Sequence, residues 1–217
     1  MKDGKKKAFF ITIEGPEGAG KSSCADVLTR HLEACGRTVI CTREPGGTPL
    51  AEKLREVVKS KPDQDEIIHP ETELLLMEAA RAQHVREKIS PALASGVSVI
   101  CDRFTDSTCA YQGGGRKMDM GTIEFLNDFA TGGCVPDFTL LLDLPPETGF
   151  ERVARRRSAD AENDRFEAEA LAFHRAVRSA FLALAEKYPQ RFRVIDASQT
   201  LDNVIEQVEK VANELIF

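Results

Sequence analysis

Short apolar runs alternate along the chain with longer segments whose apolar residues recur at helical spacing. The apolar runs predict five strands, at Ala8–Glu14, Thr38–Thr42, Val97–Asp102, Phe138–Asp143 and Arg191–Ile195. The longer segments predict helices at Lys21–Cys35, Pro49–Lys59, Pro70–Leu93, Met120–Thr131, Pro146–Arg156, Arg165–Tyr188 and Leu201–Leu215. Strands that alternate with helices are typical of a parallel sheet covered on both faces. We therefore expect an α/β fold of three layers, with ligands at the carboxyl ends of the strands.

Composition narrows the class of protein. The 217 residues fit one domain over residues 1–217, and the formal net charge of −6 argues against a nucleic-acid binder. No apolar run is long enough to span a bilayer, so we expect no membrane partner. Residues 1–7, which include Lys5, Lys6 and Lys7, are expected to form a disordered basic tail. The six cysteines show no metal-ligand spacing and indicate free thiols in a cytoplasmic protein.

The first predicted strand runs directly into a Gly-x-x-x-x-Gly-Lys-Ser motif and then a helix. This order is what a phosphate-binding P-loop requires, because the glycines and the helix N-terminus aim backbone N–H groups into one concavity. Lys21 can reach the β- and γ-phosphates, and the Ser22 hydroxyl suits Mg²⁺. The residues expected to bind the triphosphate are Gly15, Pro16, Glu17, Gly18, Ala19, Gly20, Lys21, Ser22 and Ser23. The motif predicts binding of a nucleoside triphosphate.

Unusual residues also follow the second and third predicted strands. The segment Thr42–Thr48 places a proline between Glu44 and two glycines, which makes either a sharp turn with a cis bond or an ordinary connecting loop. Asp102 can hold Mg²⁺ directly or through water, and Arg103 can clamp a phosphate with two hydrogen bonds. The alternative for this pair is a salt bridge at the end of a strand.

Three further features suggest a second ligand. Gln112 offers both a donor and an acceptor to a nucleobase edge, and the glycines after it suit a backbone that passes close to a ligand or bends freely. Met77 and Arg81 share a helix face and form either a base pocket or core packing with a snorkelling arginine. Arg152, Arg155, Arg156, Arg157 and Arg165 flank a polar loop. We interpret this cluster as an arginine-rich lid over about residues 152–165, although such a run also suits a solvated helix face.

Together these segments resemble one family, the bacterial thymidylate kinases. The matching segments are Glu14–Ser22, Thr42–Thr48, Ala79–Arg81, Asp102–Phe104, Ala110–Gly114 and Asp164–Glu167, in family order from about Ala8 to Leu215. The resemblance implies a P-loop kinase fold with a five-stranded parallel sheet and an enzyme that converts ATP and dTMP to ADP and dTDP. It also implies Mg²⁺ as cofactor and a homodimer.

The resemblance also implies roles for individual residues. Arg103 would hold the dTMP phosphate; Arg81, Thr108 and Gln112 would contact thymine; Tyr111 would crowd the sugar 2′ position; Glu17 would lie near the 3′-hydroxyl. Glu44, Pro45, Arg55 and Met77 would complete the acceptor site. Lys21, Arg103, Arg152 and Arg156 would act on the transferring phosphate, Gln199 would lie near adenine, and Ser22, with Asp102 through water, would hold Mg²⁺.

One position departs from the family pattern. The family generally has an aromatic residue four positions before the thymine-contacting arginine, where this chain has Met77. We therefore expect a looser thymine pocket, with weaker dTMP affinity or poorer rejection of dUMP. The rival interpretations are a P-loop kinase with another small-molecule acceptor and a nucleotide-dependent switch that hydrolyses ATP slowly.

Overall fold

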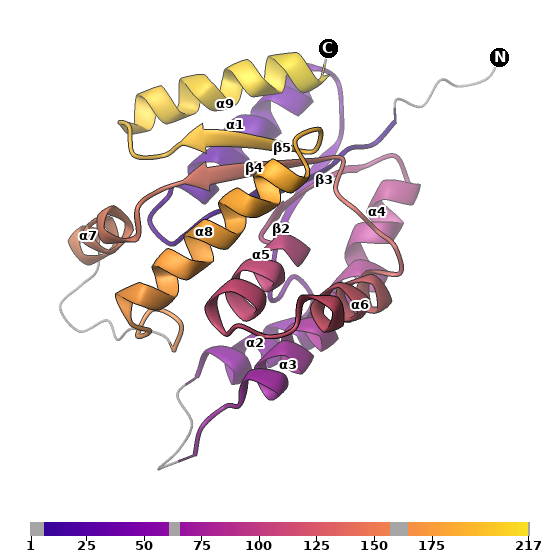
Figure 1. The fold of residues 1–217 in the computed structure, drawn as a ribbon. Coiled ribbons are helices and arrows are strands. Elements are labelled where there is room, and N and C mark those ends of the chain that lie inside the picture. Colours follow the sequence, from indigo (N-terminus) through magenta and orange to yellow (C-terminus); the bar gives the residue numbers. More distant parts are fainter. Residues whose placement is uncertain (1–6, 61–65, 157–164, 217) are drawn as a thin grey trace.

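The computed structural model describes residues 7–60, 66–156 and 165–216, so residues 1–6 of the predicted tail lie outside it. Within these ranges the strands are β1 (Phe10–Glu14), β2 (Val39–Arg43), β3 (Ser98–Asp102), β4 (Phe138–Asp143) and β5 (Phe192–Asp196). They form one parallel sheet in the order β2-β3-β1-β4-β5 (Figure 1). The five predicted strands are confirmed, and no end differs from the prediction by more than two residues.

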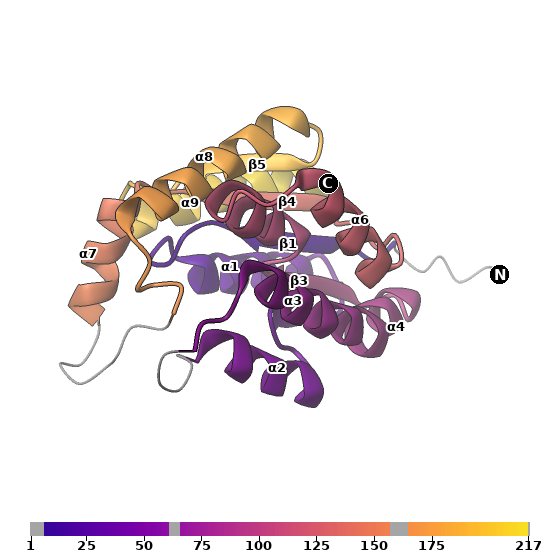
Figure 2. The ribbon, with the colours of Figure 1, turned by 60° about the horizontal axis from the view of Figure 1, so that its bottom comes forward.

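Helices cover both faces of this sheet, as predicted. In chain order they are α1 (Lys21–Ala34), α2 (Pro49–Lys59), α3 (Pro70–His84), the π-helical η1 (Val85–Ile89), α4 (Ser90–Ala94), α5 (Thr105–Thr108), the π-helical η2 (Cys109–Gly115), α6 (Met120–Thr131), α7 (Pro146–Arg156), α8 (Leu171–Lys187) and α9 (Leu201–Ile216). The α1 and α9 helices lie on one face, and η1, α4, η2 and α8 lie on the other. Figure 2 shows α2 beside α3 at the edge of the molecule.

Alternation of side chains along β1 explains the three layers. All five residues of β1 are buried. Ile11 and Ile13 point into the core shared with α1 and α9, whereas Phe10 packs edge-on against Phe104 in the opposite core. Because successive strand side chains point to opposite faces, a continuous apolar run is what a sheet buried on both sides requires.

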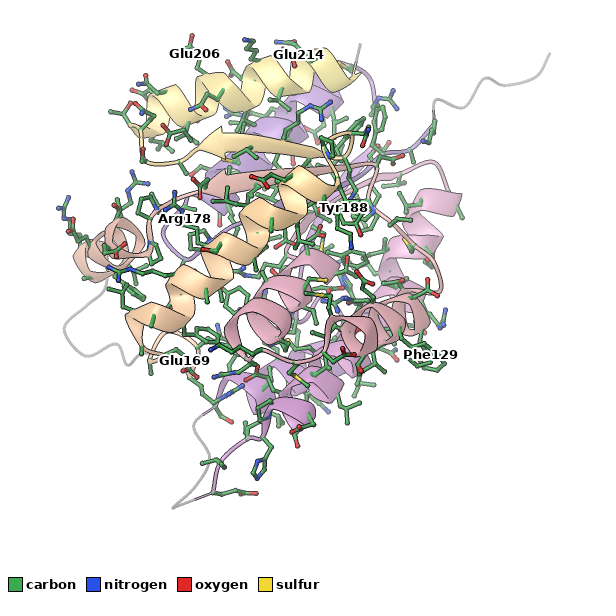
Figure 3. All side chains as sticks on the ribbon, viewed as in Figure 1. Phe129, Glu169, Arg178, Tyr188, Glu206 and Glu214 are labelled. Atoms are coloured by element: carbon green, nitrogen blue, oxygen red, sulfur yellow. The ribbon has the colours of Figure 1, made fainter. Side chains whose placement is uncertain are left out.

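The α9 helix closes the first face through an amphipathic pattern. Val204, Val208 and Ala212 recur every fourth residue and are buried against the core that α1 shares. Glu206 and Glu214, on the opposite side of the helix, point outward into solvent (Figure 3). The period of the apolar residues therefore fixes which side of α9 faces the sheet.

One of the two roles expected for the three glycines, a backbone that bends freely, is wrong. They do not bend freely but lie in the π-helical segment η2, which packs against α8, and a close approach to a ligand stays a prediction. A Cβ at Gly114 would lie 2.5 Å from the Cβ of Ala180, and one at Gly115 would meet the ring of Phe173. The glycines therefore allow two helices to approach closely.

Two predicted helices also differ in extent. The predicted helix Pro70–Leu93 is a succession of α3, η1 and α4, and the predicted helix Arg165–Tyr188 begins only at Leu171. Residues before Leu171 turn instead, since the Arg165 guanidinium reaches Val58 O, at 3.1 and 3.2 Å, and Glu73, at 2.6 Å. These tertiary bonds outweigh the helical pattern of the local sequence.

Candidate active site

The P-loop connects β1 to α1 as the motif predicts. Gly15 has φ of 136°, and a Cβ there would lie 2.5 Å from Leu142 O, so only glycine fits beside β4. Lys21 Nζ donates to Gly15 O at 3.2 Å and Pro16 O at 3.0 Å. Burial, followed by the charge of Arg103, lowers the pKa of Lys21. The lysine is thus curled back over its own loop, with its amine held among the backbone atoms that would cradle phosphates.

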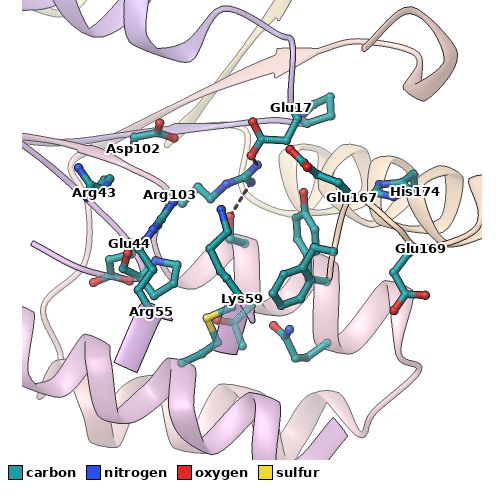
Figure 4. Close-up of a pocket in the computed structure, with 18 of the residues that line it drawn as sticks. Glu17, Arg43, Glu44, Arg55, Lys59, Asp102, Arg103, Glu167, Glu169 and His174 are labelled. Atoms are coloured by element: carbon teal, nitrogen blue, oxygen red, sulfur yellow. Dashed lines mark hydrogen bonds and ion pairs between the residues drawn. The ribbon is translucent and has the colours of Figure 1, made fainter. Parts of the chain in front are cut away.

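Arg103 joins the carboxyl end of β3 to this loop. It has φ of 70°, which is uncommon for a residue with a side chain. Its guanidinium donates to Glu17 Oε1 at 3.3 Å (Figure 4). It also donates to Ser107 Oγ at 3.2 Å and lies 5.2 Å from the centre of the Tyr111 ring. Lys21 and then Arg103 lower the pKa of Glu17 to about 2. Glu17 is therefore ionised at neutral pH and ties Arg103 to the P-loop.

A cavity of about 640 Å³ opens at this edge of the sheet. Every residue expected at the acceptor site lines it: Glu17, Glu44, Pro45, Arg55, Met77, Arg81, Arg103, Thr108, Tyr111 and Gln112. Pro16 of the P-loop and Asp102 line it too. The cavity thus adjoins the phosphate-binding loop, so one ligand in it would lie beside another on the loop.

Sequence reasoning missed several residues that line the same cavity. Lys59, at the end of α2, projects into it toward Arg103 in Figure 4. Ser107, Phe150 and His174 also line it. No motif marks these positions, because the helices that carry them come together only in the folded chain. Glu167 lines the cavity as well, and its place in the segment Asp164–Glu167 was the one available signal.

The Arg81 side chain is buried. The alternative in which its guanidinium reaches out to solvent is therefore wrong. Its guanidinium donates to Glu44 at 2.8 Å, Thr108 Oγ1 at 2.9 Å, Asn127 Oδ1 at 2.8 Å and Phe104 O at 3.1 Å, and also to Glu78. Burial opposes its charge, but Glu78 and Glu44 outweigh that effect and raise the pKa of Arg81. Nε and Nη1 make all of these bonds except the one to Phe104 O, which Nη2 makes. Nη2 therefore has a second hydrogen that could bind a ligand.

The carboxylate of Glu44, which binds Arg81, also holds the loop after β2 in place. The Glu44–Pro45 bond is cis. Glu44 Oε1 lies 2.9 Å from His84 Nδ1, and His84 Nε2 lies 2.7 Å from Thr42 Oγ1. Arg55 Nη1 donates to Pro45 O at 2.7 Å. The segment is therefore a sharp turn fixed by buried and half-buried hydrogen bonds rather than an ordinary connecting loop.

The predicted lid arginines do not gather at one point among the described residues. Arg152 donates to Ala197 O at 2.7 Å and to Gln199 O at 3.1 Å, in the loop after β5. Arg155 lies 3.6 Å from Glu151, and Arg165 binds Glu73. The Arg156 side chain, Arg157 and most of the predicted lid lie outside the described residues. The assignment of Arg152 and Arg156 to a transferring phosphate stays a prediction.

Gln199, expected near adenine, lies in the same loop after β5. Its Nε2 donates to Asp196 Oδ2 at 2.9 Å. Arg152 thus holds the carbonyl of the residue whose side chain was assigned to adenine. The contact with adenine stays a prediction.

The residues expected at the metal site fit Mg²⁺ in their chemistry. Asp102 Oδ1 is buried and has no hydrogen-bond partner among the described residues, so it has capacity for a ligand. Ser22 lies in the first turn of α1, next to Lys21. The described residues contain no group of three or more acidic, histidine or cysteine side chains that could hold a metal ion. This donor set suits Mg²⁺, which keeps several water ligands and binds through substrate phosphates.

A P-loop in the first β-α connection of a parallel sheet, beside a cavity at the carboxyl edge, defines a P-loop kinase. The thymidylate kinase family model matches residues 13–208. The chain is 52% identical over 208 residues to a thymidylate kinase of Pseudomonas fluorescens (strain Pf0-1), covering 96% of each chain. It is 53% identical over 196 residues to one of Pseudomonas syringae pv. syringae (strain B728a), covering 90% of each.

Its fold resembles a crystal structure of thymidylate kinase from Ehrlichia chaffeensis, with a TM-score of 0.75 and 31% identity, covering 96% of this chain and 98% of that one. The chain belongs to the thymidylate kinase family and is a nucleoside monophosphate kinase, as the resemblance implied.

Proposed function

We propose that the protein transfers the γ-phosphoryl group of ATP to dTMP, giving ADP and dTDP. The observation that carries this proposal is the cavity beside the P-loop, which is lined by every residue that the resemblance assigns to dTMP. The arrangement suits two phosphorylated ligands, one on the loop and one in the cavity.

The residues of the site would act by positioning and by charge. The acceptor phosphate is ionised near neutral pH and needs no strong general base. Arg103, held by Glu17 and Ser107, lines the cavity and would fix the dTMP phosphate for in-line attack. Lys21 would exchange its bonds to the loop carbonyls for the β- and γ-phosphates.

Mg²⁺, when bound, would neutralise charge on the triphosphate oxygens and fix their geometry. Ser22 would supply a direct oxygen ligand, and Asp102 would hold the ion through water. The Oδ1 atom of Asp102, which is buried and has no hydrogen-bond partner in the described part of the chain, supports this assignment.

We also propose a homodimer. Phe125 and Phe129 on α6 are 68% and 73% exposed, which is unusual for side chains of this size. A second copy of the chain would cover them, and sedimentation velocity of the protein with and without Phe129→Ser tests this. The described residues contain no helix that is long and apolar enough to cross a membrane. A cytoplasmic location stays a prediction.

An acceptor panel tests the proposed reaction. ADP formation from ATP and Mg²⁺ is measured with dTMP, dUMP, UMP, dCMP, AMP, GMP, thymidine and no acceptor. We expect strong stimulation by dTMP. Stimulation by another monophosphate alone would keep a kinase but change its substrate, and ADP formation that is independent of any acceptor would indicate the nucleotide switch instead.

A further inference from the structure

Glu73 of α3 is a buried carboxylate to which no motif assigned a role. It is 0% exposed, and four hydrogen bonds or ion pairs reach its two oxygens. Gln112 Nε2 donates to Oε1 at 2.7 Å, and the Arg116 guanidinium donates to Oε1 at 3.2 Å and Oε2 at 3.1 Å. Arg165 Nη1 lies 2.6 Å from Oε2. The accepting capacity of the carboxylate is thus filled.

This contact determines which way the Gln112 amide points. An ionised carboxylate can only accept hydrogen bonds, so the NH₂ group of Gln112 must face Glu73. The reversed amide would place two oxygens against each other in a buried site, which is unfavourable. The Gln112 carbonyl oxygen therefore lies on the side away from Glu73. It accepts no hydrogen bond from a residue in the described ranges, and Gln112 lines the acceptor cavity.

Two arginines prevent the carboxylate from turning. Arg116 binds both oxygens, and its ring contact with Phe173, at 4.7 Å, holds it against α8. Arg165 is itself fixed by bonds to Val58 O. Glu73 is therefore held on both sides, and its orientation passes to Gln112.

We propose that Glu73 is a positioning residue that makes the base pocket present a hydrogen-bond acceptor. This inference rests on the proposed function and deepens it. An acceptor at Gln112 matches a pyrimidine with a ring N3–H, as in thymine and uracil. Cytosine has an unprotonated N3 and would place two acceptors together, which a buried polar site rejects strongly. The choice of base would thus be set in part by a residue that does not touch the substrate.

Selectivity, rather than activity, tests this inference. The variant Glu73→Gln has a side chain that can donate or accept, so it no longer enforces one orientation of Gln112. The ratio of kcat/KM for dTMP to kcat/KM for dCMP, and the ratio of their Kd values by calorimetry, are measured in wild type and variant. We expect both ratios to fall at least about tenfold in Glu73→Gln. A purely structural defect would lower binding of both nucleotides alike and leave the ratios unchanged.

The matched control is Arg116→Met, which removes another partner of Glu73 but keeps the carboxylate. Arg165 still holds the carboxylate, which can only accept hydrogen bonds, so this variant should lose stability and keep both ratios. A folded Glu73→Gln, checked by circular dichroism, with wild-type ratios would overturn the proposal.

A second comparison decides the matter if Glu73→Gln does not fold. Wild type should bind dUMP at least about tenfold more tightly than 3-deaza-dUMP, which lacks the ring N–H and carries a hydroxyl at C4. Gln112→Leu should reduce this preference, because the change at C4 affects both proteins alike. Equal binding of the two nucleotides by wild type would refute the inference. Absence of any dTMP-dependent ADP formation by wild type would instead refute the proposed function, while the binding ratios still test the orientation.

Discussion

The carboxyl group of Glu14 should make stability depend on pH in an unusual direction. Glu14 ends β1 and is 0% exposed. It accepts hydrogen bonds from Phe104 N at 2.7 Å and Ser107 Oγ at 2.6 Å. Burial, and then the charge of Asp106, raise its pKa from the ordinary 4.5 to about 8. The folded protein therefore holds a proton on Glu14 that the unfolded chain has already lost at neutral pH.

The sign and size of the effect follow from this difference. Because the folded pKa is raised, the stabilising contribution is complete below pH 4.5 and is lost as pH rises through 8. Between these values it falls by about 1.4 kcal/mol per pH unit at most. From pH 5.5 to 7.5 the wild type should thus lose up to about 2–3 kcal/mol relative to a variant that cannot ionise.

Glu14→Gln is that variant, because its amide mimics the neutral acid. Urea unfolding followed by circular dichroism at pH 5.5, 6.5, 7.5 and 8.5 gives the difference in unfolding free energy between the two proteins. Glu17→Gln is the control, since the pKa of Glu17 is lowered to about 2 and its contribution is lost only as pH falls below about 4.5. Parallel curves for wild type and Glu14→Gln would refute the reasoning, and a pH-dependent difference for Glu17→Gln would point to another group.

Four further changes test the site. Lys21→Ala should lower kcat by orders of magnitude in the ADP-release assay while circular dichroism stays unchanged; near-normal turnover would contradict the P-loop assignment. Met77→Phe should lower the dTMP KM or raise the dTMP-to-dUMP ratio, and no change in either would contradict the looser pocket. Lys59→Met should raise the dTMP KM several-fold, most at low salt, because a cation leaves the cavity. Gly149→Ala should raise the ATP KM and lower the Tm in a thermal scan, because its Cβ would lie 2.7 Å from Glu17 O.

The strands, and the positions of the chemically active residues after them, could be predicted because both are marked by short continuous segments of sequence. Each strand is a continuous apolar run, and the residues with chemistry follow directly after β1, β2 and β3. The extent of the helices was less predictable. Nothing in the segment 165–170 shows that Arg165 will reach Val58 and Glu73, which lie about a hundred residues away along the chain. Tertiary bonds of this kind override local periodicity.

In the acceptor site, too, residues in sequence motifs could be predicted, whereas residues that act through tertiary contacts could not. The resemblance supplied ten of the residues that line the cavity, but not Lys59, Ser107, Phe150 or His174, which lie in no motif. It did not identify the residues that hold these side chains in place. Glu73 and His84 lie in helical sequence without a motif, and their roles follow only from their contacts with Gln112 and Glu44. Gln112 was named for its amide, but which end of the amide faces the ligand depends on Glu73, and no spacing in the sequence reveals that.

The buried charges of the acceptor site have one physical purpose in common. A buried ion pair contributes little net stability, since removing two charges from water offsets most of their attraction. Here the buried carboxylates fix polar groups that line the cavity: Glu44 holds Arg81 in an ion pair, and Glu73 holds the neutral amide of Gln112. Groups that are already oriented need no reorganisation when substrate binds. Burying these charges therefore costs stability, and in return the donors and acceptors of the pocket are already oriented before the nucleotide binds.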